Sequence, residues 1–169
     1  KNKFDKTDGW ETYHNNRSQR VTELINGDKV DYTTFKRIKF DQQLPQQLKY
    51  TYGIDSMLNL NASDYPAVKE VITAFQSWDR RSVAGSKGAA VFLITYYYLA
   101  ERLKGIPSRP ISKAEAVETY QYVHDHMMKH FGKTDLTLGD VQKLVRGDDV
   151  RPAWGFPDVL TPSFSEPYI

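Results

Sequence analysis

The stretch from residue 87 to 104 constrains the fold more than any other part of the sequence. Between Ala89 and Ala100 it is apolar almost without interruption, with Thr95 as the main exception. A helix that is apolar on all sides is buried by the elements around it. The run of about a dozen apolar residues is also shorter than the roughly 20 needed to cross a bilayer. The stretch therefore predicts a buried central helix and no membrane span.

Two long amphipathic segments flank this helix. Residues 65–78, which begin after a capping Asp64, carry apolar residues at helical spacing: Val68, Val71, Ile72, Phe75 and Trp78. Ser112 and Glu115 form a capping box for a helix that ends near His130. Its predicted inner face consists of Val117, Tyr120, His124, Met127 and Phe131. Strand patterns are scarce, so we expect a mainly α fold, an irregular helical array around the central helix.

Shorter helices are predicted near both ends. Asn15 and Asn16 can cap a first helix, with Val21, Leu24 and Ile25 on one face and Gly27 at its end. Asp31 can cap a second helix that carries Phe35, Ile38 and Phe40 before Pro45. A broken helix is expected around Gly53, within residues 44–60.

The last predicted helix begins at Thr137, paired with Asp140, and carries Leu138, Val141, Leu144 and Val145. Beyond Asp148, four prolines prevent a long helix: Pro152, Pro157, Pro162 and Pro167. The C-terminal tail is therefore expected to be extended and rich in proline.

Length and composition exclude several classes of protein. A chain of 169 residues without a composition break suggests one domain, residues 1–169. The 23 basic and 21 acidic residues leave a net charge of +2, without the concentrated basic face that nucleic-acid binding needs. The absence of cysteine excludes disulfides, thiolate metal ligands and a cysteine nucleophile. The first residues, from Lys1 to Asp5, have no apolar core of a secretory signal.

The histidines are the first candidates for chemistry. His126 and His130 lie one turn apart on the predicted helix, but His124 lies about 200° away from His126 around it. Three imidazoles on this helix therefore cannot converge on one metal ion. We interpret His124 as a core residue and the other two as a solvated face, and expect no metal site.

Other catalytic patterns are missing or incomplete. The sequence has no G-x-S-x-G nucleophile elbow. The stretch Gly85-Ser86-Lys87-Gly88 lacks the spacing of a phosphate-binding loop and suits a loop that lets the central helix enter a crowded core. Acidic residues such as Asp148 and Asp149 form no constellation. The residues alone therefore predict no self-sufficient active site.

Arg146, Gly147 and Asp148 spell the adhesive tripeptide RGD. If the last helix extends to Val145, Gly147 occupies the position where helices commonly end in a left-handed residue, and Arg146 complements the negative end of the helix dipole. We therefore interpret the tripeptide as a helix stop. Adhesion, which needs an exposed loop tip, is the less favoured reading.

Six stretches, in this order, resemble the large (β) subunit of the penicillin acylase family, which includes acyl-homoserine lactone acylases. They are NRSQRVTEL (16–24), the Phe40-Asp41 region, FQSWDR (75–80), KGAAVF (87–92), LGDVQKLVRGD (138–148) and PAWGFPDVL (152–160). Each is weak alone, but their collinearity covers nearly the whole chain. The resemblance implies an N-terminal nucleophile hydrolase, whose precursor cuts itself to expose a serine that attacks an amide carbonyl.

The resemblance also implies what this chain contributes. Lys1 cannot be the nucleophile, so the chain is expected to be an excerpt from the helical part of the β subunit, inactive without the α subunit and the sheet domain. Arg20 matches a family arginine that positions the catalytic serine and an asparagine; a surface arginine at a helix start is the equally weighted alternative. Asp8 lies near a calcium ligand of some members, but no metal or cofactor is assigned to this chain. Calcium remains open for the full-length enzyme.

The family further implies a small-molecule amide substrate and a periplasmic or secreted location, and leaves the acyl specificity undetermined. The alternative function is a stand-alone helical module that binds a protein or peptide through the neighbourhood of Trp78 and Tyr96-Tyr97-Tyr98.

Overall fold

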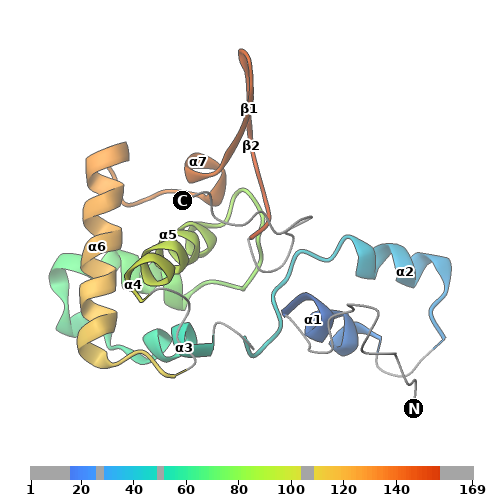
Figure 1. Ribbon diagram of the computed structural model, residues 1–169, viewed down its shortest axis with the longest axis horizontal. Coiled ribbons are helices and arrows are strands. Elements are labelled where there is room, and N and C mark those ends of the chain that lie inside the picture. Colours follow the sequence, from blue (N-terminus) through green and yellow to red (C-terminus); the bar gives the residue numbers. More distant parts are fainter. Residues whose placement is uncertain (1–15, 26–28, 49–51, 104–108, 157–169) are drawn as a thin grey trace.

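Helix α5 (Lys87–Arg102) is the centre of the fold in the computed structural model of the chain, which describes residues 16–25, 29–48, 52–103 and 109–156. Every residue from Gly88 to Thr95 is buried, as is Leu99. Helices α4 (Lys69–Gln76) and α6 (Lys113–Phe131) and the short helix α7 (Leu138–Val141) pack around it (Figure 1). The predicted mainly α array around a buried central helix is confirmed.

The apolar stripe on α4 packs against α5. Val71, Ile72 and Phe75 are each at most 2% exposed, as the pattern predicted. The start of the helix was predicted too early: Asp64 ends a short 3-10 turn, η3 (Ala62–Asp64), and a second turn, η4 (Pro66–Val68), precedes α4. Pro66 is the cause, because a residue before proline is pushed out of the helical region, and Tyr65 has φ −132° and ψ 69°.

Helix α6 begins at the predicted capping box, with the Ser112 side chain accepting from the Glu115 N–H and Glu115 returning a contact to the Ser112 N–H. Its inner face is rotated from the predicted one. Tyr120 and Met127 are buried as expected, but Ala116, Thr119 and Val123 complete the buried stripe. The prediction that His124 is a core residue was wrong: its ring is half-buried and contacts the neighbouring Asp125 carboxylate at 3.0 Å.

Two short helices form the other end of the molecule. Helix α1 (Asn16–Leu24) and helix α2 (Tyr32–Lys39) lie together as an arm on the side of α5 away from α6 (Figure 1). Asp31 caps α2 as predicted, through a 2.7 Å bond from the Thr34 N–H. Within α2 only Ile38 is buried, and Phe35 and Phe40, which the predicted helix also carries, are exposed.

The segment between the arm and α4 folds as short turns. Helix α3 (Tyr52–Asp55) continues into the 3-10 helix η2 (Ser56–Asn59). Ile54 and Met57 are fully buried and anchor this broken helix to the core. The prediction of broken helix around Gly53 is therefore confirmed.

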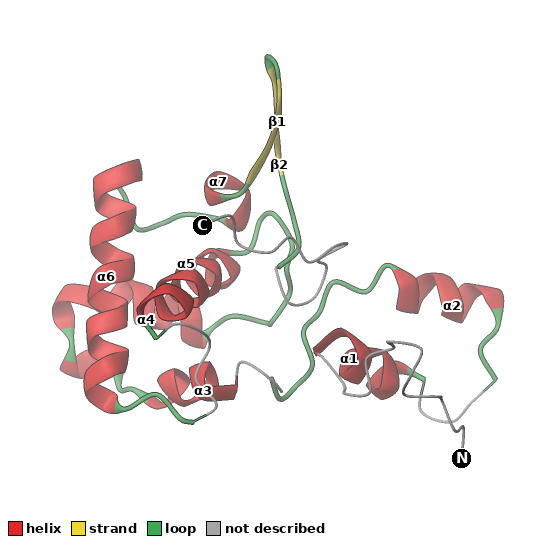
Figure 2. Cartoon of the chain, in the orientation of Figure 1, coloured by secondary structure: helices red, strands yellow, loops and turns green. Residues whose placement is uncertain are grey.

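The prediction for residues 142–148 was wrong. Helix α7 ends at Val141, and strands β1 (Lys143–Arg146) and β2 (Asp149–Pro152) form an antiparallel hairpin that projects from the body (Figure 2). Val145 lies opposite Val150, and Gly147, at φ 60°, forms the two-residue turn with Asp148. Glycine followed by aspartate suits the two central positions of such a turn. Arg146, Gly147 and Asp148 therefore lie at an exposed hairpin tip and do not end a helix.

The end of the tail lies outside the described residues from Pro157 onward, and Pro152, the first proline of that tail, belongs to β2. Among the helices that the structure describes, none is both long and apolar enough to cross a membrane.

Candidate functional site

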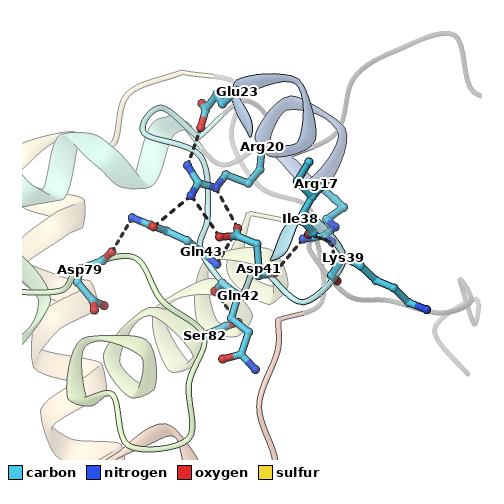
Figure 3. A network of polar contacts seen from close by, with 10 residues as sticks. All are labelled: Arg17, Arg20, Glu23, Ile38, Lys39, Asp41, Gln42, Gln43, Asp79 and Ser82. Carbon is cyan, nitrogen blue, oxygen red and sulfur yellow. Dashed lines mark hydrogen bonds and ion pairs between the residues drawn. The ribbon is translucent and has the colours of Figure 1, made fainter. Parts of the chain in front are cut away.

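Arg20 lies on α1 and points at the connector between α2 and the rest of the chain (Figure 3). Its Nε donates to Asp41 Oδ2 at 3.0 Å and its Nη2 to Asp41 Oδ1 at 3.3 Å. Nη2 also donates to the Gln43 side-chain oxygen at 3.2 Å, and Nη1 to Glu23 at 3.2 Å. The forked contact with Asp41 fixes the plane of the guanidinium, because both ends of the carboxylate are used.

This geometry leaves Arg20 with donor capacity. A guanidinium carries five N–H donors, and four hydrogen bonds are formed within the described part of the chain. The side chain is 14% exposed, and Asp41 is 18% exposed. Arg20 is thus a half-buried cation whose orientation is fixed by hydrogen bonds, and one of its Nη1 hydrogens has no acceptor among the described residues.

The charges of Arg20 and Asp41 support each other. The hydrogen bond to Asp41 raises the pKa of Arg20 above its usual value and outweighs the effect of burial. Burial alone raises the pKa of Asp41, but the Arg20 hydrogen bond and charge, helped by the Gln43 N–H, outweigh it and hold that pKa below its usual value. Both groups are therefore charged at neutral pH.

Arg17 lies three residues before Arg20 on the same face of α1. Its side chain caps the C-terminal end of α2. Its Nη2 donates to the carbonyls of Ile38 and Lys39 at 3.2 Å each, and its Nη1 to the Asp41 carbonyl at 3.0 Å. Carbonyls at a helix C-terminus have no partner inside the helix, and a cation there complements the dipole. Together Arg17 and Arg20 fix both the backbone and the side chain of Asp41 against α1.

The connector after Asp41 pairs with the loop between α4 and α5. The Ser82 N–H donates to the Gln42 carbonyl at 2.9 Å, and the Leu44 N–H to the Arg80 carbonyl at 2.9 Å. The Gln43 side chain, which accepts from Arg20, donates to the Asp79 carbonyl at 3.3 Å (Figure 3). The Arg20 network thereby reaches the body of the molecule.

The same loop receives the C-terminal segments. The Gly155 N–H donates to the Ser82 carbonyl at 3.1 Å, and the Gly139 N–H to the Ala84 carbonyl at 2.7 Å. Trp78 packs edge-on against Phe156, with ring centroids 5.7 Å apart. Residues 78–86 are therefore a junction at which three distant stretches of sequence meet: the 41–44 connector, α7 and residues 155–156.

Arg80 in this junction has an uncommon backbone conformation. Its φ of 62° is the single positive φ of a non-glycine residue in the described segments. Its Nη2 donates to Asp55 at 2.8 Å, while its Nη1 is buried without a partner. A strained residue of this kind persists only where its surroundings determine it, and such residues gather at functional sites.

The penicillin amidase family model matches residues 2–160 of the chain. The chain belongs to the penicillin amidase family. The match spans all six stretches that resemble this family. At the junction, Trp78 contacts Phe92 and Phe156, and Gly139 donates to the Ala84 carbonyl. Arg20 reaches the junction only through Gln43. No curated protein matches the chain.

The histidines lie apart from this junction. The rings of His126 and His130 are 4.5 Å apart on one face of α6, as the predicted one-turn spacing requires. Burial, with the charges of His130 and Lys129, lowers the pKa of His126. The described residues contain no group of three or more histidine or acidic side chains that could hold a metal ion. Asp8 lies outside the described residues.

The glycine-rich stretch before α5 has a structural role. Ser86 caps the helix by accepting from the Ala89 N–H at 3.2 Å, and Lys87 pairs with Asp135 at 2.5 Å. A Cβ on Gly88 would overlap the Trp78 side chain, so this glycine lets α5 approach α4 closely. This confirms the expected loop that admits the central helix into a crowded core.

The sequence pointed to Arg20 through the family resemblance but did not reveal the contacts of Arg20 with its partners. Arg17 could have been found from its i, i−3 spacing on the same helix face. Gln43 and the 79–82 loop gave no signal, because their contacts join residues about 40 positions apart. The alternative function assigned one binding surface to Trp78 and the three tyrosines 96–98. These residues do not form one surface, because Trp78 packs on Phe92, whereas Tyr98 stacks on Tyr122.

Proposed function

We propose that this chain is the helical part of the β subunit of a penicillin-acylase-type N-terminal nucleophile hydrolase. The full enzyme cleaves non-peptide C–N bonds in acylated small molecules. The family match over residues 2–160 is the observation that carries the proposal. The nucleophilic serine, exposed by self-cleavage of the precursor, is expected on the sheet domain, and the enzyme in the periplasm or outside the cell.

Within that enzyme, Arg20 is proposed to position the catalytic serine and asparagine. Three features support this role: the fork to Asp41 that fixes the guanidinium, its charge at neutral pH, and an Nη1 hydrogen without an acceptor in the described segments. A guanidinium held in this way can donate to a neighbouring group in a fixed direction without reorganising. Arg20 is thus a positioning residue, and Asp41 is the residue that orients it.

The role is tested in the full-length precursor by Arg20→Ala, Arg20→Lys and Arg17→Ala, with kcat and KM measured on an amide substrate and maturation followed by gel electrophoresis. We expect Arg20→Ala to lower kcat or maturation roughly tenfold or more, because misplacement of a catalytic group by a fraction of an ångström has effects of this size. Arg20→Lys should restore little, since lysine lacks the fork.

Arg17→Ala is the matched control, because it removes an arginine of α1 that donates to backbone carbonyls of residues 38, 39 and 41 and forms no hydrogen bond with the Asp41 carboxylate. Equal losses in Arg17→Ala and Arg20→Ala, with equal losses of thermal stability, would show that Arg20 is a structural residue only. The placement of the nucleophile has a separate test: the 169-residue chain alone should not hydrolyse an amide that the full precursor hydrolyses. Activity of the chain alone would contradict it.

A further inference from the structure

A cleft on the far side of α5 from the Arg20 network is lined mainly by aromatic rings. It has a volume of about 260 Å³ and lies between α5, α6 and α7. Its lining residues on α5 recur at helical spacing on one face of that helix: Leu93, Ile94, Tyr97, Tyr98 and Glu101. Tyr122 and His126 of α6 form the opposite wall, with Phe131 and Val141 beside them.

The floor and the walls of the cleft differ in exposure. Leu93 and Ile94 are 6% and 9% exposed and form an apolar floor. Tyr97, Tyr122 and Phe131 are exposed at the walls by 57%, 38% and 39%. Aromatic rings that stay in water at the edge of an apolar depression provide a surface for a flat or apolar group.

The charge of the cleft is negative. Glu101 is its single carboxylate, and no ion pair to Glu101 is formed by the described residues. The imidazole of His126, in the opposite wall, is neutral at pH 7, because burial and the neighbouring His130 and Lys129 charges lower its pKa. No lysine or arginine lines the cleft. Glu101 therefore repels an anionic ligand and attracts a cation, and the nearest positive charge, that of Arg102, is paired with Glu118.

One ring of the cleft already contacts a cation of the chain. The guanidinium of Arg102, which pairs with Glu118, lies 5.9 Å from the centroid of the Tyr98 ring. The other ring in contact with Tyr98 is that of Tyr122, stacked at 4.0 Å. Tyr97 has no such cation in the described part of the chain and is the most exposed ring of the cleft. Tyrosine faces attract cations through the ring quadrupole, in addition to any carboxylate nearby.

We propose that this cleft binds an organic ammonium ion with an apolar or aromatic body. The body lies on Leu93 and Ile94 between the tyrosines, and the ammonium contacts Glu101 and the Tyr97 ring. This site lies outside the Arg20 network, and its existence does not depend on the proposed hydrolase function.

The test is a titration of the 169-residue chain with 2-phenylethylammonium, followed by NMR. We expect a dissociation constant on the order of a millimolar, as is usual for a ligand of this size in a shallow site, with shifted resonances at Tyr97, Tyr122 and Val141. Neutral 2-phenylethanol should bind roughly fivefold more weakly, which is the upper range for an exposed ion pair, and anionic 3-phenylpropionate more weakly still.

Glu101→Gln should lower the affinity for 2-phenylethylammonium to that for 2-phenylethanol and leave the affinity for the alcohol unchanged. Tyr97→Ala should weaken the binding of the ammonium ion roughly two- to fivefold. Glu70→Gln, which changes an exposed carboxylate of α4 outside the cleft, is the matched control and should change neither affinity. Unchanged circular dichroism and melting temperature establish that each variant is folded.

Three results would overturn the proposal: no saturable binding of the ammonium ion, equal affinity for all three probes, or an affinity that Glu101→Gln leaves unchanged. Equal affinities would reveal an apolar depression without charge selectivity.

Discussion

Asp41 is the residue through which Arg20, Arg17 and Gln43 are joined. It accepts two hydrogen bonds from Arg20 with its carboxylate and one from Arg17 with its carbonyl. We expect Asp41→Asn to lower the free energy of unfolding by about 1–2 kcal/mol, because the amide keeps one acceptor oxygen but lacks the negative charge and the second acceptor that the half-buried guanidinium uses. Urea denaturation of the chain measures the change.

Asp149→Asn is the control at this scale. Asp149 pairs with Arg151 on the hairpin, but these side chains are 57% and 73% exposed. An exposed pair contributes little, so this substitution should change the free energy of unfolding by less than about 0.5 kcal/mol. Equal effects of the two substitutions would show that the Asp41 network adds nothing beyond a surface ion pair.

The Asp41 pair also predicts a dependence of stability on pH. Because the folded-state pKa of Asp41 is lowered, its contribution is present above the unfolded pKa of about 4 and is lost as the pH falls through the folded value. The difference in free energy of unfolding between the natural chain and Asp41→Asn should thus be constant from about pH 7 to 5 and shrink below about pH 4. A constant difference down to pH 3 would contradict this assignment. Because both proteins contain the same other acidic residues, the contributions of those residues cancel in this difference.

At the scale of elements, the packing of α5 on α4 depends on Gly88. A Cβ there would overlap Trp78 and lie 2.8 Å from the Ala74 carbonyl oxygen. Gly88→Ala is therefore expected to lower the free energy of unfolding by about 1–3 kcal/mol, the usual range for overpacking, although alanine favours helix. Thermal unfolding followed by circular dichroism measures it. Gly85→Ala, where a Cβ meets nothing within 4 Å, should be neutral.

The RGD tripeptide lies at the tip of the β1–β2 hairpin. All residues of β1 and β2 are exposed, including Leu144, Val145 and Val150. The interpretation of the tripeptide as a helix stop was wrong, because Arg146, Gly147 and Asp148 form or flank an exposed turn. Adhesion, the alternative to a helix stop, is tested by integrin-dependent cell attachment that Asp148→Glu abolishes.

For the whole molecule, the distribution of buried contacts predicts unequal local stability. The core cluster is formed mainly by α4, α5 and α6, whereas α2 buries one residue and the hairpin none. A two-stranded hairpin without further packing is marginally stable in water. Native-state hydrogen exchange should therefore be slowest in α5 and faster, by a factor of about 100 or more, in α2 and β1. Uniform protection across the chain would contradict this prediction.

The sequence by itself determined the elements whose information is local. The all-round apolar pattern of residues 89–99 identified the buried centre, and the capping residues Asp31 and Ser112 identified the starts of two helices. Local patterns also placed Arg20 on a helix, whereas only the resemblance to the penicillin acylase family identified it as a candidate site residue.

Tertiary structure alone decided the rest, because the deciding contacts join residues distant in sequence. The fork of Arg20 to Asp41 spans 21 positions, and the pairing of Gln42 with Ser82 spans 40. The inner face of α6 was rotated because its apolar residues permit more than one stripe, and packing against α5 and α4 selects one. Residues 143–152 fold as strands because β1 and β2 form backbone hydrogen bonds with each other. The spacing of apolar residues within either segment does not reveal this pairing.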